Sequence, residues 1–474
     1  MQERKKFILN TLNLIWLIVL YHIVGNKSIF LYALSLSLYN IFESSFNHIS
    51  IKESFKKIIT TKSKEKILKY LLLIIGVISF LFLLLSILIS DITSIFLKIN
   101  NILPIFILMG ITIINKPLIR LLTEYLENIK SNHKYLKLIT IYEIIEKTLL
   151  LIFALLSFRI FKLNIISSIS LLYFSKIISL FIIIYFIYKT RNIGKYNYVL
   201  GEDNINYKKE IKKTLTNNSQ KSMIDIIKNS YYYISIIILY IILSTRYHYQ
   251  IDEIEKIITF IYFYAFGIIH YLIYLAKSVT NKLPKDALVT DKLYQSFKMM
   301  LTITIIFGMI SPLTCKVIFN DPSKSIYLTM INFLAIFILL YDMTYENIKN
   351  KKMIYISLLI GLIIKIILIV PLINSFYRMG YSLIYGDILS TIIGMFISII
   401  INYIYLRNIN KNNDNYFEKI LNILYENIIL TIILIIVQFV IPMDTNNYFK
   451  SLCLIIIYLI ISIAFIKIKN KKRG

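Results

Sequence analysis

The sequence predicts an all-α fold, a polytopic membrane helical bundle of about 14 transmembrane helices, because its apolar residues form long blocks. Of its 474 residues, 57% are hydrophobic and 17% are charged, whereas about a quarter of the residues in a soluble domain are charged. Blocks such as 70–90 and 299–313 are continuous and lack the alternation of barrel strands. A helix of about 20 apolar residues crosses the hydrocarbon core with its backbone hydrogen bonds satisfied.

The apolar blocks alternate with polar connections along the whole chain. We expect spanning helices at 7–24, 29–49, 67–90, 101–123, 136–161, 165–188, 222–245, 256–278, 299–319, 326–346, 353–373, 380–406, 418–441 and 450–468. Three of these blocks, the fourth, fifth and tenth, are interrupted by Lys116, Pro117, Arg120, Glu143, Glu146, Lys147 and Asp342.

Basic residues are distributed unevenly between alternate connections. The formal net charge is +27, and with a cytoplasmic N-terminus the inner segments hold about 35 Lys and Arg against about 8 outside, as the positive-inside rule requires. Omitting one span would invert every later loop. We therefore expect a multi-pass protein of the cytoplasmic membrane with both termini inside. The basic loops would bind anionic lipids, and their placement argues against a nucleic-acid partner.

Two long basic connections indicate an internal repeat. Residues 50–66 follow the second span and 279–298 follow the eighth, so six spans separate equivalent positions. The predicted domains are a six-helix lobe at 1–205, a second at 206–410, and an extra helix pair with a basic tail at 411–474. An even number of spans per repeat predicts parallel repeats, a plan in which transporters bind substrate between the lobes.

The first basic connection has a helical pattern. One face would carry Ile51, Phe55, Ile58 and Ile59, and the rest Lys52, Lys56 and Lys57. This pattern suits a helix lying on an anionic leaflet. The alternative is a solvated basic loop.

Enzyme and metal signatures are missing from the sequence. It contains no H-E-x-x-H, G-x-S-x-G, Walker or G-x-G-x-x-G motif. Its histidines never recur at metal-ligand spacing, and Cys315 and Cys453 form no C-x-x-C. We expect no enzyme, cofactor or metal. An ion gradient, the membrane potential or the substrate's own gradient would supply the energy.

Polar residues inside predicted spans are the candidate site, because ionisable groups at membrane depth usually face a cavity or a partner. The substrate-cavity candidates are Asn10 and Asn13 on the first span, Asn40, Glu43 and Asn47 on the second, and Asp225, Lys228 and Asn229 on the seventh. The alternatives are that these side chains extend to the interface or bond neighbouring helices.

Two structural ion pairs are also expected. Glu146 would pair with Lys176, or within its own span with Lys147. Lys365 and Asp387 lie at similar distances on either side of an outer turn expected near 374–380, which would place them at one depth. Alternatively, one of these two side chains faces the cleft.

Two segments resemble the multidrug/oligosaccharidyl-lipid/polysaccharide (MOP) flippase superfamily. RLLTEYLENIKSNHKYLKLITIYEIIEKTLLL (120–151) resembles the end of its span four and the start of its span five, including a glutamate matched by Glu146. Residues 363–408 resemble its spans eleven and twelve, with a lysine-isoleucine opening, a proline, a short outer turn that contains Gly380 and a long following span. The polysaccharide branch, with its Wzx-type, stage V sporulation protein B and lipid II flippases, is the most similar. One departure is that the first span has no arginine after Arg4.

The resemblance implies a flippase that moves polyprenyl-diphosphate-linked oligosaccharide from the inner to the outer leaflet. It also implies that spans one, two, seven and eight line the cleft, so that the candidate polar residues would meet the diphosphate-sugar head group, with Lys228 as the cation. A drug or cation antiporter of the same superfamily is the alternative. A polytopic glycosyltransferase or polymerase is disfavoured by the short outer loops.

The predicted topology can be tested with reporter fusions placed after Lys213 and after Arg473. Both should report a cytoplasmic location, because the Lys and Arg asymmetry places both segments inside. Phosphatase and fluorescent-protein fusions measure the two sides independently. An outer signal at either position contradicts the topology.

Overall fold

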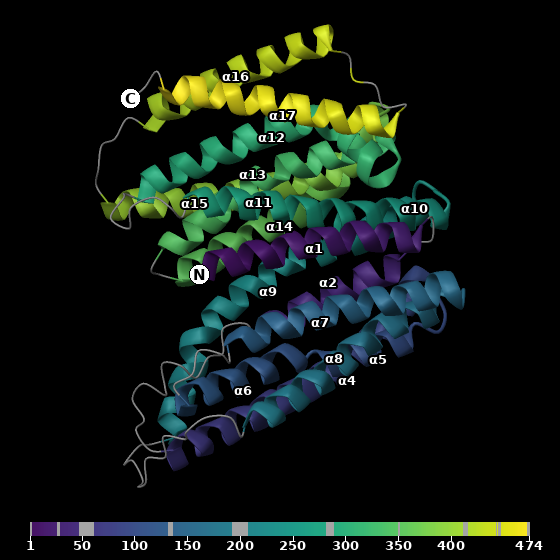
Figure 1. Ribbon diagram of the computed structural model, residues 1–474, viewed down its shortest axis with the longest axis vertical. Helices are drawn as coiled ribbons and strands as arrows, with labels where there is room; N and C mark the ends of the chain where they lie inside the picture. Colours follow the sequence, from purple (N-terminus) through teal and green to yellow (C-terminus); the bar gives the residue numbers. More distant parts are fainter. Residues whose placement is uncertain are drawn as a thin grey trace. The chain divides into compact units, whose positions relative to one another are not determined.

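The computed structural model is helical throughout the part of the chain that it describes (Figure 1). It describes residues 2–25, 29–46, 61–130, 136–191, 207–280, 289–348, 351–410, 416–441, 443 and 447–471. Within these ranges there is no β-strand, and 11 helices or helix runs are long and apolar enough to cross a membrane. The predicted class, an all-α membrane bundle, is confirmed.

Each of the predicted spans coincides with a helix or a run of helices. They are α1 (Gln2–Val24), α2 (Phe30–Ser44), α4 (Thr61–Leu97), α5 (Leu103–Thr112), α6 (Asn115–Lys130), α7 (Leu136–Ala154), η2 (Leu155–Ile160), α8 (Ile165–Arg191), α9 (Tyr207–Thr245), α10 (Ile251–Thr259), η3 (Phe260–Ala265), α11 (Phe266–Thr280), α12 (Val289–Phe319), η4 (Pro322–Lys324), α13 (Ser325–Asn347), α14 (Lys351–Arg378), α15 (Ile384–Asn410), α16 (Tyr416–Val440) and α17 (Tyr448–Lys471). The 11 membrane-length helices do not include α2, α7 or α17, so the total of 14 crossings stays a prediction.

Two predicted spans are interrupted helices. The fourth is divided into α5 and α6, and Pro117, which has no backbone N–H to donate, lies in the first turn of α6, where proline is tolerated. The eighth consists of α10, the π-helical turn η3 and α11. Conversely, α9 extends well beyond the predicted 222–245. The leaflet-helix prediction for 51–59 lies outside the described residues.

The described chain forms two compact units. One comprises 23–259, and the other comprises 1–22 together with 260–474. We call them the 23–259 unit and the 260–474 unit. The division near residue 259 follows from the packing of α9 on α2 and α4 within the 23–259 unit. The predicted lobes, with boundaries at 205 and 410, stay a prediction. The repeat itself stays a prediction.

Small residues permit a close helix pairing in the 260–474 unit, that of α14 and α15. A Cβ added to Gly386 would overlap the backbone of Ile373 and Leu372, and one added to Gly394 would meet the carbonyl oxygen of Gly361. The two backbones therefore touch without intervening side chains, as small residues allow in membrane helix packing.

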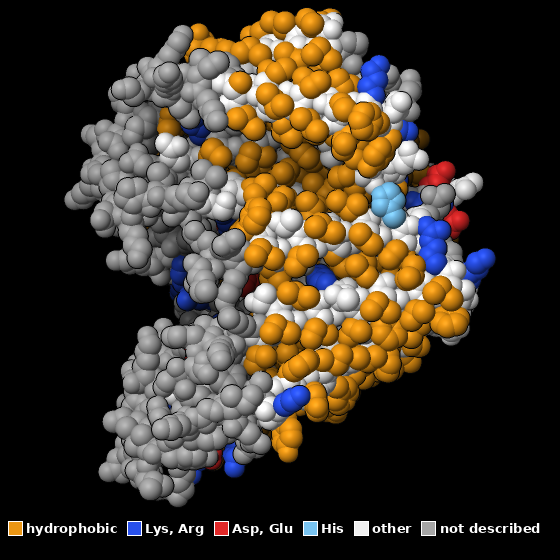
Figure 2. Space-filling view, viewed as in Figure 1, with side chains coloured by type: hydrophobic (Ala, Val, Ile, Leu, Met, Phe, Trp, Pro, Cys, Tyr) orange, Lys and Arg blue, Asp and Glu red, His pale blue; other side chains and the backbone are white. Residues whose placement is uncertain are grey.

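Hydrophobic side chains cover much of the described surface. On the face in Figure 2, orange side chains spread over most of the described helices and few blue or red ones interrupt them. On α4, for example, Leu73, Val77 and Phe80 are each more than half exposed. Such a surface is stable in lipid, whereas a soluble monomer rarely exposes so large an apolar patch.

The α14–α15 contact gives a stability prediction. Gly386→Ala should lower the free energy of unfolding by about 1–3 kcal/mol, because the added methyl group forces two backbones apart. Thermal melting of the purified protein in detergent measures this. Gly76→Ala is the matched control, since a Cβ there meets no atom within 4 Å. Equal melting temperatures for the two variants would contradict the close contact.

Candidate functional site

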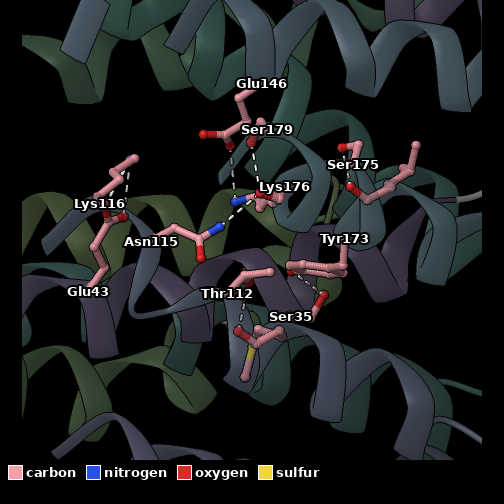
Figure 3. A network of polar contacts seen from close by, with 12 residues as sticks. Ser35, Glu43, Thr112, Asn115, Lys116, Glu146, Tyr173, Ser175, Lys176 and Ser179 are labelled. Atoms are coloured by element: carbon pink, nitrogen blue, oxygen red, sulfur yellow. Dashed lines mark hydrogen bonds and ion pairs between the residues drawn. The ribbon is translucent and has the colours of Figure 1, made fainter. Parts of the chain in front are cut away.

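Charged side chains meet inside the 23–259 unit, where α2 faces α6 (Figure 3). Lys116 Nζ lies 2.9 Å from Glu43 Oε1 and 3.2 Å from Glu43 Oε2. The Glu43 residue is 6% exposed, whereas the Lys116 side chain is 42% exposed. The pair therefore joins a buried carboxylate to an ammonium at an accessible edge, and each charge offsets the desolvation cost of the other.

A second pair lies deeper in the same unit. Lys176 Nζ of α8 is 3.5 Å from Glu146 Oε1 of α7, and both side chains are less than 10% exposed. The ammonium also lies 4.0 Å from the centre of the Tyr39 ring. A carboxylate and an aromatic face together stabilise this buried cation. The predicted contact of Glu146 with Lys176 is thus present.

Neutral hydrogen bonds connect these pairs to the helix backbones. Asn115 Nδ2 donates to the Lys176 carbonyl at 2.9 Å, and the Tyr173 hydroxyl donates to Ser35 Oγ at 2.9 Å. Ser179 Oγ donates to the same Lys176 carbonyl at 2.7 Å. These bonds fix the positions of three segments relative to one another, namely the start of α6, the middle of α8, and α2. We call Ser35, Tyr39, Glu43, Asn115, Lys116, Glu146, Tyr173, Lys176 and Ser179 the polar network.

A recess of about 170 Å³ borders the polar network. Its lining is Phe46, Lys116, Pro117, Ile119, Arg120, Ile139, Tyr142 and Glu143. Arg120 Nε is 3.3 Å from Glu124 Oε1 one turn along α6. The recess presents two cationic side chains and one carboxylate among apolar groups, so it can admit water or a small polar group. Among the described residues, no group of three His, Cys, Asp or Glu side chains could hold a metal ion.

The predicted cavity residues are divided between the two units. Asn229 of α9 donates to the Asn40 carbonyl at 3.2 Å and to Ser44 Oγ at 2.7 Å, which ties α9 to α2. Asp225 and Lys228 are half-buried on α9, within the same unit. The half-buried Asn10 and Asn13 belong to α1 in the 260–474 unit, and Asn47 lies outside the described residues.

Neighbouring residues of α2 contact different helices. The Asn40 carbonyl and the Ser44 hydroxyl accept hydrogen bonds from Asn229 of α9, whereas the Glu43 side chain pairs with Lys116 of α6. Successive side chains of a helix differ in direction by about 100°, so adjacent positions can face different neighbours. A substrate cavity at Asn40 and Glu43 stays a prediction.

The predicted pairing of Lys365 with Asp387 is not supported by the register of α14 and α15. The Lys365 Cβ lies beside Gly394, seven residues beyond Asp387, which is about 10 Å along a helix that rises about 1.5 Å per residue. The offset arises because α14 continues to Arg378, so the turn is centred later than 374–380 suggests. The pairing itself stays a prediction. Both residues are fully buried, and Asp387 accepts a hydrogen bond from the Tyr262 hydroxyl.

Sequence reasoning missed the Glu43–Lys116 pair, although a signal for it exists. Glu43 and Lys116 lie about equally far from the predicted outer ends of their spans, at 29 and 101. Opposite charges at one depth in neighbouring spans are candidates for pairing. The sequence does not reveal that the two spans are neighbours.

Comparison with known proteins gives likeness in structure alone. No family model matches the sequence, and no curated protein matches it. The solved structure of the lipid II flippase MurJ, in an inward closed conformation, superposes with a TM-score of 0.70 and 16% identity, covering 99% of this chain and 98% of that one.

Two multidrug transporter structures are also similar. An outward-facing MATE family transporter of the MOP superfamily matches with a TM-score of 0.51 and 11% identity, covering 85% of this chain and 94% of that one. The MATE multidrug transporter DinF-BH matches with a TM-score of 0.52 and 13% identity, over 86% and 93%. This chain has the MOP-superfamily fold. The resemblance found in 120–151 and 363–408 is thus confirmed at the level of the fold.

The buried pair in the polar network gives a second stability prediction. Lys176→Met leaves Glu146 charged without its partner, which costs about 3–5 kcal/mol in buried pairs. Thermal melting in detergent should show a clear loss, and adding Glu146→Gln should restore part of it. Lys189→Met, an exposed lysine on the same helix, is the matched control. If Lys176→Met and Lys189→Met melt alike, the pair contributes no stability.

Proposed function

We propose that this chain is a MOP-superfamily transporter that moves an anionic, polyprenyl-diphosphate-linked oligosaccharide from the inner to the outer leaflet by alternating access. The observation that carries the proposal is the extent of the structural likeness. The lipid II flippase corresponds over 99% of this chain, whereas the two multidrug transporters correspond over 85% and 86%. The three similar structures described above are named as a flippase and two transporters, which agrees with a chain that is not an enzyme.

The final helix pair supports this choice, because it is firmly attached to the 260–474 unit. Lys298 Nζ of α12 lies 3.0 Å from Glu426 Oε2 of α16, and Thr302 Oγ1 donates to Asn427 Oδ1 at 3.0 Å. An apolar cluster joins α12, α16 and α17 through Ile310, Leu313, Leu430, Leu434, Leu454 and Tyr458. The pair α16–α17 is therefore an integral part of the bundle. This agrees with the proposed flippase architecture, in which two helices follow the two six-helix lobes.

The substrate's diphosphate would need cationic partners. Lys228, half-buried on α9, and Lys116 and Arg120 at the recess are the candidates in the 23–259 unit. Arginine and lysine are the usual partners of phosphate groups. Coupling to an ion gradient or the membrane potential, and anionic lipid at the basic loops, belong to the same proposal.

A drug or cation antiporter is the second candidate, favoured by the likeness to the MATE structures. The two candidates differ in the charge of their cargo. An antiporter of cationic drugs needs carboxylates that face its substrate, whereas Glu146 is buried and paired with Lys176. This pairing favours the flippase.

Depletion of the protein in its native cell tests the proposed function. Lipid-linked oligosaccharide should accumulate in the inner leaflet, because its synthesis continues while its export stops. Mass spectrometry of extracted lipids measures the accumulation. Vesicles containing the purified protein should also expose a fluorescent polyprenyl-diphosphate sugar to an external quencher faster than protein-free vesicles do. Unchanged lipid levels together with increased drug sensitivity would support the antiporter.

A further inference from the structure

Aromatic rings gather where the end of α1 meets the turn between α12 and α13. The Tyr21 ring centre is 4.7 Å from that of Phe319 and 5.0 Å from that of Tyr264, and Phe260 is 5.0 Å from Phe319. All three contacts are edge-on, the arrangement that aromatic pairs prefer. Every one of these residues belongs to the 260–474 unit. We call this cluster the aromatic box.

The ammonium of Lys324 occupies the aromatic box. Lys324 Nζ donates to the Tyr21 hydroxyl at 2.9 Å and lies 5.2 Å from the centre of the Tyr21 ring and 5.3 Å from that of Phe260. The Tyr21 hydroxyl in turn donates to the Phe319 carbonyl at 3.3 Å. The Lys324 side chain is 26% exposed. A cation over aromatic faces is attracted most strongly where it is partly shielded from water.

Asp321 sets the position of Lys324. Its Oδ1 accepts hydrogen bonds from Ser323 N at 3.1 Å and Ser323 Oγ at 2.6 Å, which caps η4, and its Oδ2 lies 3.5 Å from Lys324 Nζ. Partial burial of this carboxylate opposes its charge. The hydrogen bonds from Ser323 and the charge of Lys324 outweigh burial and keep the pKa of Asp321 below its usual value. The turn is therefore a preformed holder for the ammonium.

The aromatic box lies beside both points where the chain passes between the two units. These points fall after His22 and before Phe260. Just after the first crossing point, α1 ends at Val24, and Gly25 has a φ of +66°. At the second crossing point, Phe260 is the first residue of the π-helical turn η3. Glycine in this conformation and a π-turn are places where a helix direction changes at small cost.

We propose that Lys324, held by Tyr21 and Phe260, is a latch that fixes the two crossing points to the α12–α13 turn and opens during each transport cycle. Its motion rests on the proposed function, since alternating access requires the units to move. In the predicted topology the latch lies at the outer end of the bundle. When the ammonium leaves the box, Tyr21 and Phe260 lose the cation that lies over both rings and keep only their ring contacts with Phe319. The ends of α1 and η3 are then held less tightly to α12 and can bend more easily relative to it.

The native Cys315, buried on α12 one turn before Phe319, reports on the latch without any transport assay. In a Cys453→Ala background, Lys324→Met should raise the rate at which a small water-soluble thiol reagent modifies Cys315. The rise should be roughly three- to thirtyfold, the range that one cation–aromatic contact supports. Lys324→Arg keeps the cation and should stay near the parent rate.

Lys316→Met, the loss of a lysine next to Cys315, is the matched control. Removing a nearby positive charge by itself slows reaction of a thiol, because the thiolate is the reactive form. The expected acceleration in Lys324→Met therefore has the opposite sign to the direct charge effect. An unchanged Cys315 rate in Lys324→Met overturns the latch, whether or not the protein proves to flip lipid.

A cross-link tests whether the latch must open. In a Cys315→Ala, Cys453→Ala background, Tyr21→Cys and Lys324→Cys would be joined by a short bifunctional thiol reagent that a reductant can cleave. Vesicle flipping of the fluorescent lipid-linked sugar should stop after cross-linking and return after reduction. In each single-cysteine variant, the reagent should leave the rate of flipping unchanged. Flipping at the parent rate in the cross-linked protein overturns the latch. Absence of flipping in the parent itself would instead count against the proposed function.

Discussion

A hydrocarbon solvent offers no hydrogen-bond partner, and this constraint shapes the whole molecule. A charge that the sequence places inside an apolar helix needs a partner, because an unpaired charge at that depth is expensive. In the 23–259 unit, Glu43 pairs with Lys116 and Glu146 with Lys176. In the 260–474 unit, Lys277 Nζ lies 2.6 Å from Asp342 Oδ2. Polar contacts of this kind thus specify which helices are neighbours, which apolar packing against lipid cannot do.

The same constraint explains the role of small and hydroxyl residues. Glycines allow α14 and α15 to touch along their backbones, and serine hydroxyls bond carbonyl groups within the bundle, as Ser398 Oγ does to the Ser357 carbonyl at 2.9 Å. With little hydrophobic force between helices in lipid, close contact and hydrogen bonding hold each unit together. Internally compact units are compatible with the proposed alternating access.

The latch and the polar network use one principle for different ends. In both, a lysine ammonium lies against aromatic rings and near a carboxylate, with Lys176 beside Tyr39 and Glu146, and Lys324 beside Tyr21 and Asp321. Lys176 is almost fully buried, so its partners stabilise a permanent contact. Lys324 keeps a quarter of its side chain exposed. Water can replace its partners there at modest cost, which suits a contact that opens and closes.

The sequence by itself determined the class of fold and the positions of the helices, because both depend on local hydrophobicity and on the length needed to cross a bilayer. It also located the charged residues within apolar helices, such as Glu43, Lys116 and Lys365. Only the tertiary structure decided their partners. The sequence does not say that α2 lies beside α6, and an error of a few residues in the turn between α14 and α15 moved Asp387 about 10 Å from the level of Lys365. The direction of a side chain changes by about 100° with each residue along a helix. The sequence therefore predicts how deep in the membrane a residue lies, whereas the packing of the helices determines which neighbour its side chain faces.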